Sequence, residues 1–121
     1  MSRQIKNGDG WRIGWDPNAT DYCGLVGGED WSLELTAAEL DDFCRLVVQL
    51  ADSISQIAAE LMNDEKISCE VESPLLWLEA EGYAHAYSLR MLILTGRRAE
   101  GAWAESAVAG LIHAAQTLKF F

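Results

Sequence analysis

The sequence contains few of the residues on which disulfides, metal sites and histidine catalysis depend. Its 121 residues include three cysteines and two histidines, and no two cysteines have C-x-x-C spacing. An odd count without that spacing argues against a disulfide framework and against a zinc site. We therefore expect Cys23, Cys44 and Cys69 to be free thiols that behave as small hydrophobic side chains, and we predict no cofactor and no metal ion.

Positive charge is also scarce. Nine lysines and arginines stand against 19 aspartates and glutamates, which gives a formal net charge of −10. Nucleic-acid-binding proteins normally have the opposite balance, because neutralisation of phosphates supplies much of their affinity. This composition therefore disfavours nucleic acid as a ligand. It suits a soluble protein kept apart by self-repulsion, or one that docks onto a basic partner.

Long apolar runs are missing as well. No window reaches the roughly 18 uninterrupted apolar residues that a membrane-spanning helix needs. Residues 1–10 lack the apolar segment of a signal peptide. With 50% hydrophobic and 23% charged residues, the chain has the composition of one globular domain. We expect a cytoplasmic protein that does not bind a membrane.

Motifs for catalysis are absent too. The sequence holds no phosphate-binding loop, dinucleotide fingerprint, H-E-x-x-H pair or calcium loop. His85 falls on the apolar row of a predicted strand and His113 on a predicted helix, and we expect a structural role for each. No acid and base can be paired for general catalysis. We therefore expect that the protein is not an enzyme, and a small-molecule or catalytic role in a cleft between sheets has the least support.

The residues that are present form two stretches of strand-like alternation, each followed by an amphipathic helix. Residues 1–10 are polar and are expected to form a flexible lead-in, so the predicted domain spans residues 11–121. Its first half, residues 11–63, shows apolar residues at every second position, which predicts three strands. These strands are Trp11 to Trp15, Tyr22 to Val26 and Trp31 to Leu35.

A long helix is predicted to close the first half. Thr36 and Glu39 have the spacing of a capping box, which marks a helix start at Ala37. Apolar residues then recur at three- and four-residue steps as far as about Met62. Between the second and third strands, the pair Gly27-Gly28 is expected to close a hairpin through positive φ angles.

The second half, residues 66–121, repeats this order. Four strands are predicted near residues 66–72, 76–80, 85–93 and 99–103, with a helix from about Ala104 to Leu118. The predicted fold class is α+β, with two antiparallel sheet units each followed by a helix. A strip of small residues on the last helix predicts a close helix–helix contact, within the chain or in an oligomer: Ala107, Gly110 and Ala114.

The first hairpin of the second half supplies the candidate binding surface. Pairing across Ser73-Pro74 sets Glu70 opposite Trp77 and points Trp77 outward among glutamates. An exposed tryptophan on a sheet is a candidate contact for a partner protein, a ligand or a nucleic-acid base. Carboxylates on one face can hold a cation, although a solvated face is the simpler interpretation. The candidate binding residues are Trp77, Glu70 and Glu79, with a basic cluster of Arg90, Arg97 and Arg98 on the neighbouring strand and turn.

Two binding hypotheses follow from this surface. We favour a non-catalytic binding or adaptor protein that recognises another protein, through the acidic and aromatic sheet surface or through the long helix. The alternative is single-stranded nucleic-acid binding, or a transcription-related role, through Trp77 and the three arginines. The sequence names no partner and leaves the oligomeric state open.

Two segments of the chain are distinctive, G-W-R-I-G-W-D-P at residues 10–17 and W-S-L-E-L-T at residues 31–36. With these segments and the helix that follows, the whole chain resembles a family of small uncharacterised proteins found mainly in cyanobacteria. That family has no assigned activity, so no functional residues carry over. The resemblance implies a fold similar to the Whirly-type single-stranded-DNA-binding regulators, which bind strands through basic and aromatic sheet surfaces. The acidic strands of this chain depart from that pattern.

Overall fold

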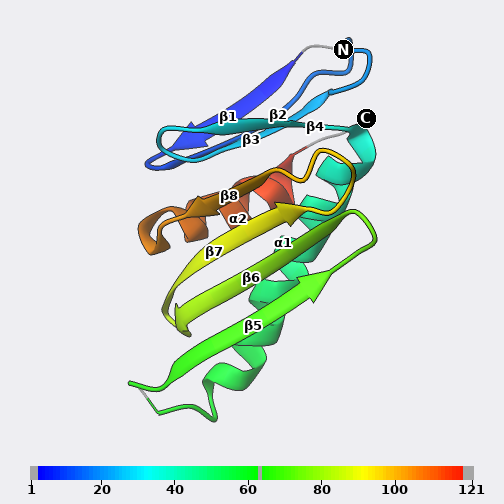
Figure 1. Ribbon diagram of the computed structural model, residues 1–121. Coiled ribbons are helices and arrows are strands. Elements are labelled where there is room, and N and C mark those ends of the chain that lie inside the picture. Colours follow the sequence, from blue (N-terminus) through cyan, green and yellow to red (C-terminus); the bar gives the residue numbers. More distant parts are fainter. Residues whose placement is uncertain (1–2, 63, 119–121) are drawn as a thin grey trace.

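The computed structural model describes residues 3–62 and 64–118, and these form two antiparallel four-stranded sheets and two helices (Figure 1). The predicted α+β class, with a helix after each sheet, is confirmed. The first sheet has the order β1 (Gln4–Gly8), β2 (Trp11–Trp15), β3 (Gly24–Gly27) and β4 (Ser32–Leu35), and α1 (Ala37–Ala58) follows it. The second has the order β5 (Lys66–Glu72), β6 (Leu76–Tyr83), β7 (Ala86–Ile93) and β8 (Glu100–Trp103), and α2 (Glu105–Thr117) follows it.

The N-terminal segment differs from the prediction. We expected a flexible lead-in over residues 1–10, whereas Gln4–Gly8 pairs with β2 as an edge strand. Its sequence Q-I-K-N-G has one apolar residue, so it shows no apolar–polar alternation that would predict a strand. The strand is instead held by pairing and by a tertiary contact, in which Lys6 Nζ donates to Thr117 Oγ1 of α2 at 2.6 Å.

The two helices lie between the sheets. α1 contacts β3 and β4 of the first sheet and β5 and β6 of the second, while α2 contacts β1 and β2 on one side and β7 on the other. The 22 residues of α1 span about 33 Å at the rise of an α-helix. Figure 1 shows α1 starting beside the first sheet and crossing behind the second. The helix therefore crosses the second sheet (Figure 1).

The capping box fixes the start of α1 as predicted. Glu39 N donates to Thr36 Oγ1 at 3.1 Å, and Thr36 N donates to Glu39 Oε1 at 2.9 Å. The helix ends at Ala58 rather than near Met62. The last apolar residues of the predicted helical pattern therefore lie near the end of the helix or in the turns that follow it.

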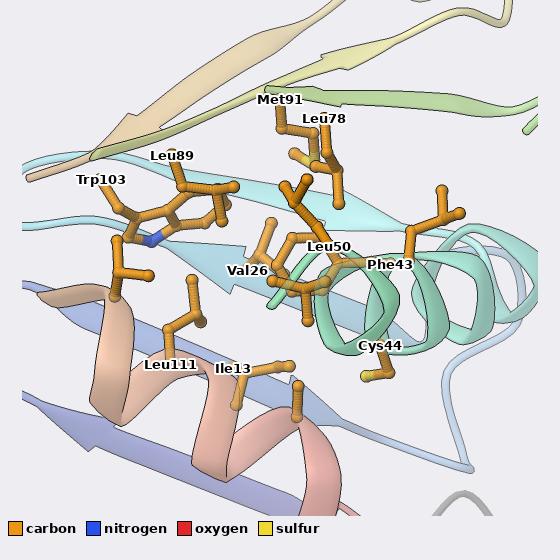
Figure 2. Packing of buried hydrophobic residues seen from close by; sticks show 14 of the residues in the cluster. Ile13, Val26, Phe43, Cys44, Leu50, Leu78, Leu89, Met91, Trp103 and Leu111 are labelled. Atoms are coloured by element: carbon orange, nitrogen blue, oxygen red, sulfur yellow. The ribbon is translucent and has the colours of Figure 1, made fainter. Parts of the chain in front are cut away.

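The core forms where the inner faces of both sheets meet both helices. Trp103 lies at this junction: its indole is 1% exposed and donates Nε1–H to Gly27 O at 2.8 Å, across the two sheets. Figure 2 shows the surrounding side chains pointing into one common space. Those exposed by at most 1% come from every layer: Ile13, Val26, Phe43, Leu50, Leu78, Leu89, Met91 and Leu111.

Gly28, the residue after β3, makes room for a tryptophan. Gly27 and Gly28 lack the positive φ angles that we predicted; among the described glycines only Gly10 and Gly82 have them. A Cβ on Gly28 would lie 2.1 Å from Trp31 Nε1. Because Gly28 has no Cβ at this position, the Trp31 indole can reach the second sheet, where it donates to Ala102 O at 3.1 Å.

The small residues of α2 make room for another tryptophan. A Cβ on Gly110 would lie 2.4 Å from Trp11 Nε1. α1 and α2 do contact each other, but Gly110 serves a contact with β2 instead. The predicted helix–helix role of this strip is therefore wrong for Gly110.

The β5–β6 hairpin has a register two residues away from the predicted one. Glu70 lies opposite Glu79, and Trp77 lies opposite Glu72. The loop is wider than the two-residue Ser73-Pro74 turn on which the predicted register was based, as a proline at the second loop position favours. Ser73 Oγ accepts from the N–H groups of Leu75 and Leu76 at 3.1 and 3.2 Å. Side chains alternate with a period of two, so a two-residue shift leaves each of them on its predicted face.

Candidate functional site

The outer face of the β5–β8 sheet is the strongest candidate surface. Both helices contact this sheet from one side, and Figure 1 shows them behind it, with its other side uncovered. We call the outward side chains of this side the acidic face. Its charged residues are five glutamates against one lysine and one arginine: Glu70, Glu72, Glu79, Glu81, Glu100, Lys66 and Arg90.

Strand pairing arranges the acidic face in rows. One row runs across four strands as Glu72, Trp77, Leu92 and Glu100. The neighbouring row runs as Glu70, Glu79, Arg90 and Ala102. Trp77 and Leu92 thus form an apolar centre, and carboxylates flank it at both ends of its row.

Arg90 lies against Trp77 at the centre of this face. Its guanidinium carbon is 5.1 Å from the centroid of the Trp77 ring, and its Nη2 is 3.5 Å from Glu79 Oε1. A cation over an indole face contributes about 0.5–1 kcal/mol at an exposed site, and an exposed ion pair about 0–1 kcal/mol. Arg90, whose side chain is 53% exposed, is therefore held weakly.

The structure does not bring Arg97 to the acidic face. Arg97 lies in the turn between β7 and β8 and reaches the first half of the chain, where Nη1 donates to Glu34 O of β4 at 2.6 Å and Nη2 donates to Glu39 Oε1 of α1. Its guanidinium carbon also lies 4.6 Å from the Tyr22 ring centroid. The side chain that we predicted to bind a ligand instead links the two halves of the chain.

Arg98 occupies a backbone position that few residues adopt. Its φ of 51° makes it the one non-glycine residue with positive φ among residues 3–62 and 64–118. Its N–H donates to Thr95 O at 3.1 Å, which closes the turn. The predicted cluster is therefore divided: Arg90 and Arg97 are each paired with a carboxylate, and Arg98 is exposed without a carboxylate within ion-pair distance among the described residues.

The three cysteines are free, and no group of three or more His, Cys, Asp or Glu side chains in the described part of the chain is arranged to hold a metal ion. Burial, with a smaller contribution from Asp41, raises the pKa of the Cys44 thiol to about 12. A thiol with so high a pKa is a poor nucleophile at neutral pH.

The predicted strand position of His85 is wrong. We placed it on the apolar row of a strand, whereas it lies in the turn between β6 and β7 and is exposed. Its ring stacks on Tyr83, with centroids 5.8 Å apart. The alternation continues into this turn in the sequence, so the pattern alone gave no signal of where the strand begins.

Sequence reasoning also missed one member of the apolar centre and one of its neighbours. Leu92 lies beside Trp77 through the β6–β7 register, and Glu72 lies on its other side through the β5–β6 register. The correct length of the Ser73–Leu75 loop would have placed Glu72 opposite Trp77. None of the helices in the described ranges is both long and apolar enough to span a bilayer.

Comparisons with known proteins show what the chain as a whole is similar to. Residues 6–118 match the model of a domain of unknown function, DUF1818. The chain is also similar to a protein of unknown function from the DUF155 family of Prochlorococcus sp. NATL2A, known from a crystal structure. The two are 28% identical with a TM-score of 0.91, over 96% of this chain and 98% of the other. None of the curated proteins matches the chain. The predicted resemblance to proteins of unknown function, with a cyanobacterial relative, is confirmed.

Proposed function

This chain belongs to the DUF1818 family, a domain of unknown function, and we propose that it is a non-catalytic binding protein whose acidic face recognises a basic segment of another protein. The observation that carries the proposal is the position of Trp77. Its ring lies among glutamates, with the Arg90 guanidinium 5.1 Å from its centroid. The protein's own arginine thus occupies the place that a partner's lysine or arginine would take.

The charges around Trp77 support a basic partner. Glu70, Glu72 and Glu81 make no ion pair with any described residue. Complementary charges across an interface speed association and disfavour partners of the wrong sign. Tryptophan is enriched among the residues that contribute most to binding energy. A partner with alternating cationic and apolar side chains would therefore satisfy both kinds of group on this face.

Single-stranded nucleic acid is the alternative ligand. Trp77, which is half-buried on the acidic face, is the feature that favours it, because bases stack on accessible aromatic rings. The charges oppose it. Five glutamates on the acidic face would repel phosphates, and Arg97 is engaged with Glu39 and with Glu34 O. A protein partner therefore remains the preferred ligand.

Two further parts of the proposal concern fold family and location. We propose a Whirly-like fold, which is supported by two four-stranded antiparallel sheets that are each followed by a helix. We also propose a cytoplasmic location. Three free cysteines support it, since unpaired thiols are typical of a reducing compartment.

Titration of two labelled probes tests the proposed ligand class. The probes are a peptide of alternating Lys and Leu and a single-stranded oligothymidylate, each followed by fluorescence anisotropy at low and at physiological salt. We expect the peptide to bind more tightly than the oligonucleotide. We also expect Trp77→Ser and Glu70→Lys each to raise the Kd of the peptide by at least about tenfold, as for loss of a central anchor.

Asp21→Lys is the matched control, because Asp21 is exposed in the loop between β2 and β3 and the substitution makes the same charge change as Glu70→Lys. Equal weakening by both substitutions would show that net charge alone attracts the peptide. Tight oligonucleotide binding that falls steeply with salt would favour the nucleic-acid alternative instead.

A further inference from the structure

The turn between β6 and β7 separates two hollows on the helix side of the second sheet. One, of about 360 Å³, lies between this turn and α2 and is lined by Tyr87, Val108 and Ile112 among others. The other, of about 240 Å³, lies between the turn and the end of α1 and is lined by Leu61 and Met62 among others. Ala84 and His85 line both hollows. We call the two together the turn groove.

The turn groove is bordered by apolar side chains that the fold leaves uncovered. Met62, which lines the smaller hollow, is 75% exposed. Leu61 and Ile112 are half-buried within the groove. Isolated exposed apolar residues are ordinary, but a contiguous apolar patch on a rim of polar residues marks an interaction site.

The charges of the rim select the occupant. Glu65 lies at one hollow and Glu105 at the other, and the described residues that line the two hollows include no lysine or arginine. A second copy of this chain would bring a formal net charge of −10 against these carboxylates, so self-association is disfavoured. An apolar segment with flanking cations would satisfy both the groove and its rim.

We infer that the turn groove docks a basic amphipathic helix of a partner protein. Such a helix places apolar side chains at intervals of three and four residues on one face, which insert into a groove, while its cations remain at the rim. The larger hollow, of about 360 Å³, lies within the range of about 300–1,000 Å³ in which protein pockets bury a ligand. The inference goes beyond the acidic face, since the groove lies on the opposite side of the second sheet and uses other residues.

Binding of a model helix to the full chain tests the inference. The probe is a labelled peptide of leucine and lysine with leucine at positions i, i+3, i+4 and i+7, and fluorescence anisotropy reports its Kd. Met62→Lys and Ala109→Lys put a cation at exposed positions of the two hollows. We expect each substitution to raise the Kd by about tenfold or more.

Ile5→Lys is the matched control, because Ile5 is a 50% exposed apolar residue of the first sheet and the charge change is the same. We expect it to change the Kd by less than about twofold. Unchanged urea midpoints in all three variants would show that each is folded.

Three outcomes would overturn the inference. The first is equal weakening by Ile5→Lys, and the second is equal binding of a peptide with glutamate in place of lysine. The third is weakening by Trp77→Ser and Glu70→Lys but not by the groove variants. That third result would assign the peptide to the acidic face and leave the proposed function intact. Conversely, loss of binding in the groove variants alone supports the groove whatever the acidic face binds.

Discussion

Arg97 and Glu39 form an ion pair although they are 58 residues apart in the sequence. The Glu39 side chain is 3% exposed, and its two oxygens accept from three donors: Arg97 Nη2, Thr36 N at 2.9 Å and Thr95 Oγ1 at 3.2 Å. One carboxylate therefore caps α1 and joins that helix to the β7–β8 turn. Because Arg97 also bonds Glu34 O, this turn is tied to both sheets.

Removal of Arg97 should leave a buried carboxylate without its counter-charge. We expect Arg97→Ala to lower the free energy of unfolding by about 2–3 kcal/mol, below the roughly 3–5 kcal/mol of fully buried pairs, because the Arg97 side chain is 32% exposed. Urea unfolding followed by circular dichroism measures the change. Arg98→Ala should change stability by at most about 0.5 kcal/mol. Equal effects of both substitutions would contradict a specific role for Arg97.

The role of Glu39 shows what a single sequence can and cannot reveal. Its capping function depends on a residue three positions away, so the T-x-x-E pattern predicted it correctly. Its pairing with Arg97 depends on how the two sheets pack, and no local spacing encodes that contact. Arg97 was therefore interpreted as a surface cation available to a ligand, although its guanidinium bonds partners in the first half of the chain.

The acidic face was predicted more successfully, for a physical reason. Which face a strand residue occupies depends on period-two alternation, which is local, whereas its cross-strand neighbours depend on the loop. Trp77 and Glu79 therefore lie on the predicted face even though the register is shifted by two residues. The strand β1 was missed because its polar residues give no alternation, and its pairing with β2 decides its structure.

Cys44 should make stability depend on alkaline pH. Burial raises its pKa from the ordinary 9.0 to about 12 in the folded chain. The unfolded chain therefore loses the thiol proton first, so the stabilisation is complete below about pH 9 and is lost as pH rises toward about 12. The slope attributable to this thiol is at most about 1.4 kcal/mol per pH unit.

Urea unfolding of the wild type and of Cys44→Ala isolates this effect from other titrating groups. The comparison runs from about pH 8 to about pH 11, a range that brackets the ordinary thiol pKa. We expect the stability difference between the two proteins to shrink as pH rises. A difference that stays constant over that range would show that the thiol titrates alike in both states.

Gly110 should respond to alanine in the opposite sense from an ordinary helix glycine. Alanine in place of glycine usually stabilises an exposed helix interior by about 0.8–1 kcal/mol. Here the new Cβ would lie 2.4 Å from Trp11 Nε1, and the indole also lies 2.5 Å from where a Cβ on Gly8 would be. We expect Gly110→Ala to lower the free energy of unfolding by about 1–3 kcal/mol. Gly96→Ala is the control, because nothing lies within 4 Å of its Cβ position, and a neutral or stabilising result is expected.

Arg90 separates the two ligand classes proposed for the acidic face. If the partner is basic, Arg90 competes with it for the Trp77 ring and for Glu79, so Arg90→Ala should tighten binding of the Lys-Leu peptide by about three- to tenfold, the equivalent of about 0.6–1.4 kcal/mol. If the ligand is nucleic acid, the same substitution removes a phosphate contact and should weaken oligothymidylate binding. Stability should change by less than about 1 kcal/mol, since the Arg90–Glu79 pair is exposed.

Arg45→Ala is the matched control: it removes the same charge from α1, where Arg45 pairs with Asp42 at 2.6 Å. Its effect on the peptide Kd should be smaller, because Arg45 lies on a helix behind the sheet and cannot reach Trp77. Equal tightening by both substitutions would reduce the role of Arg90 to that of net charge.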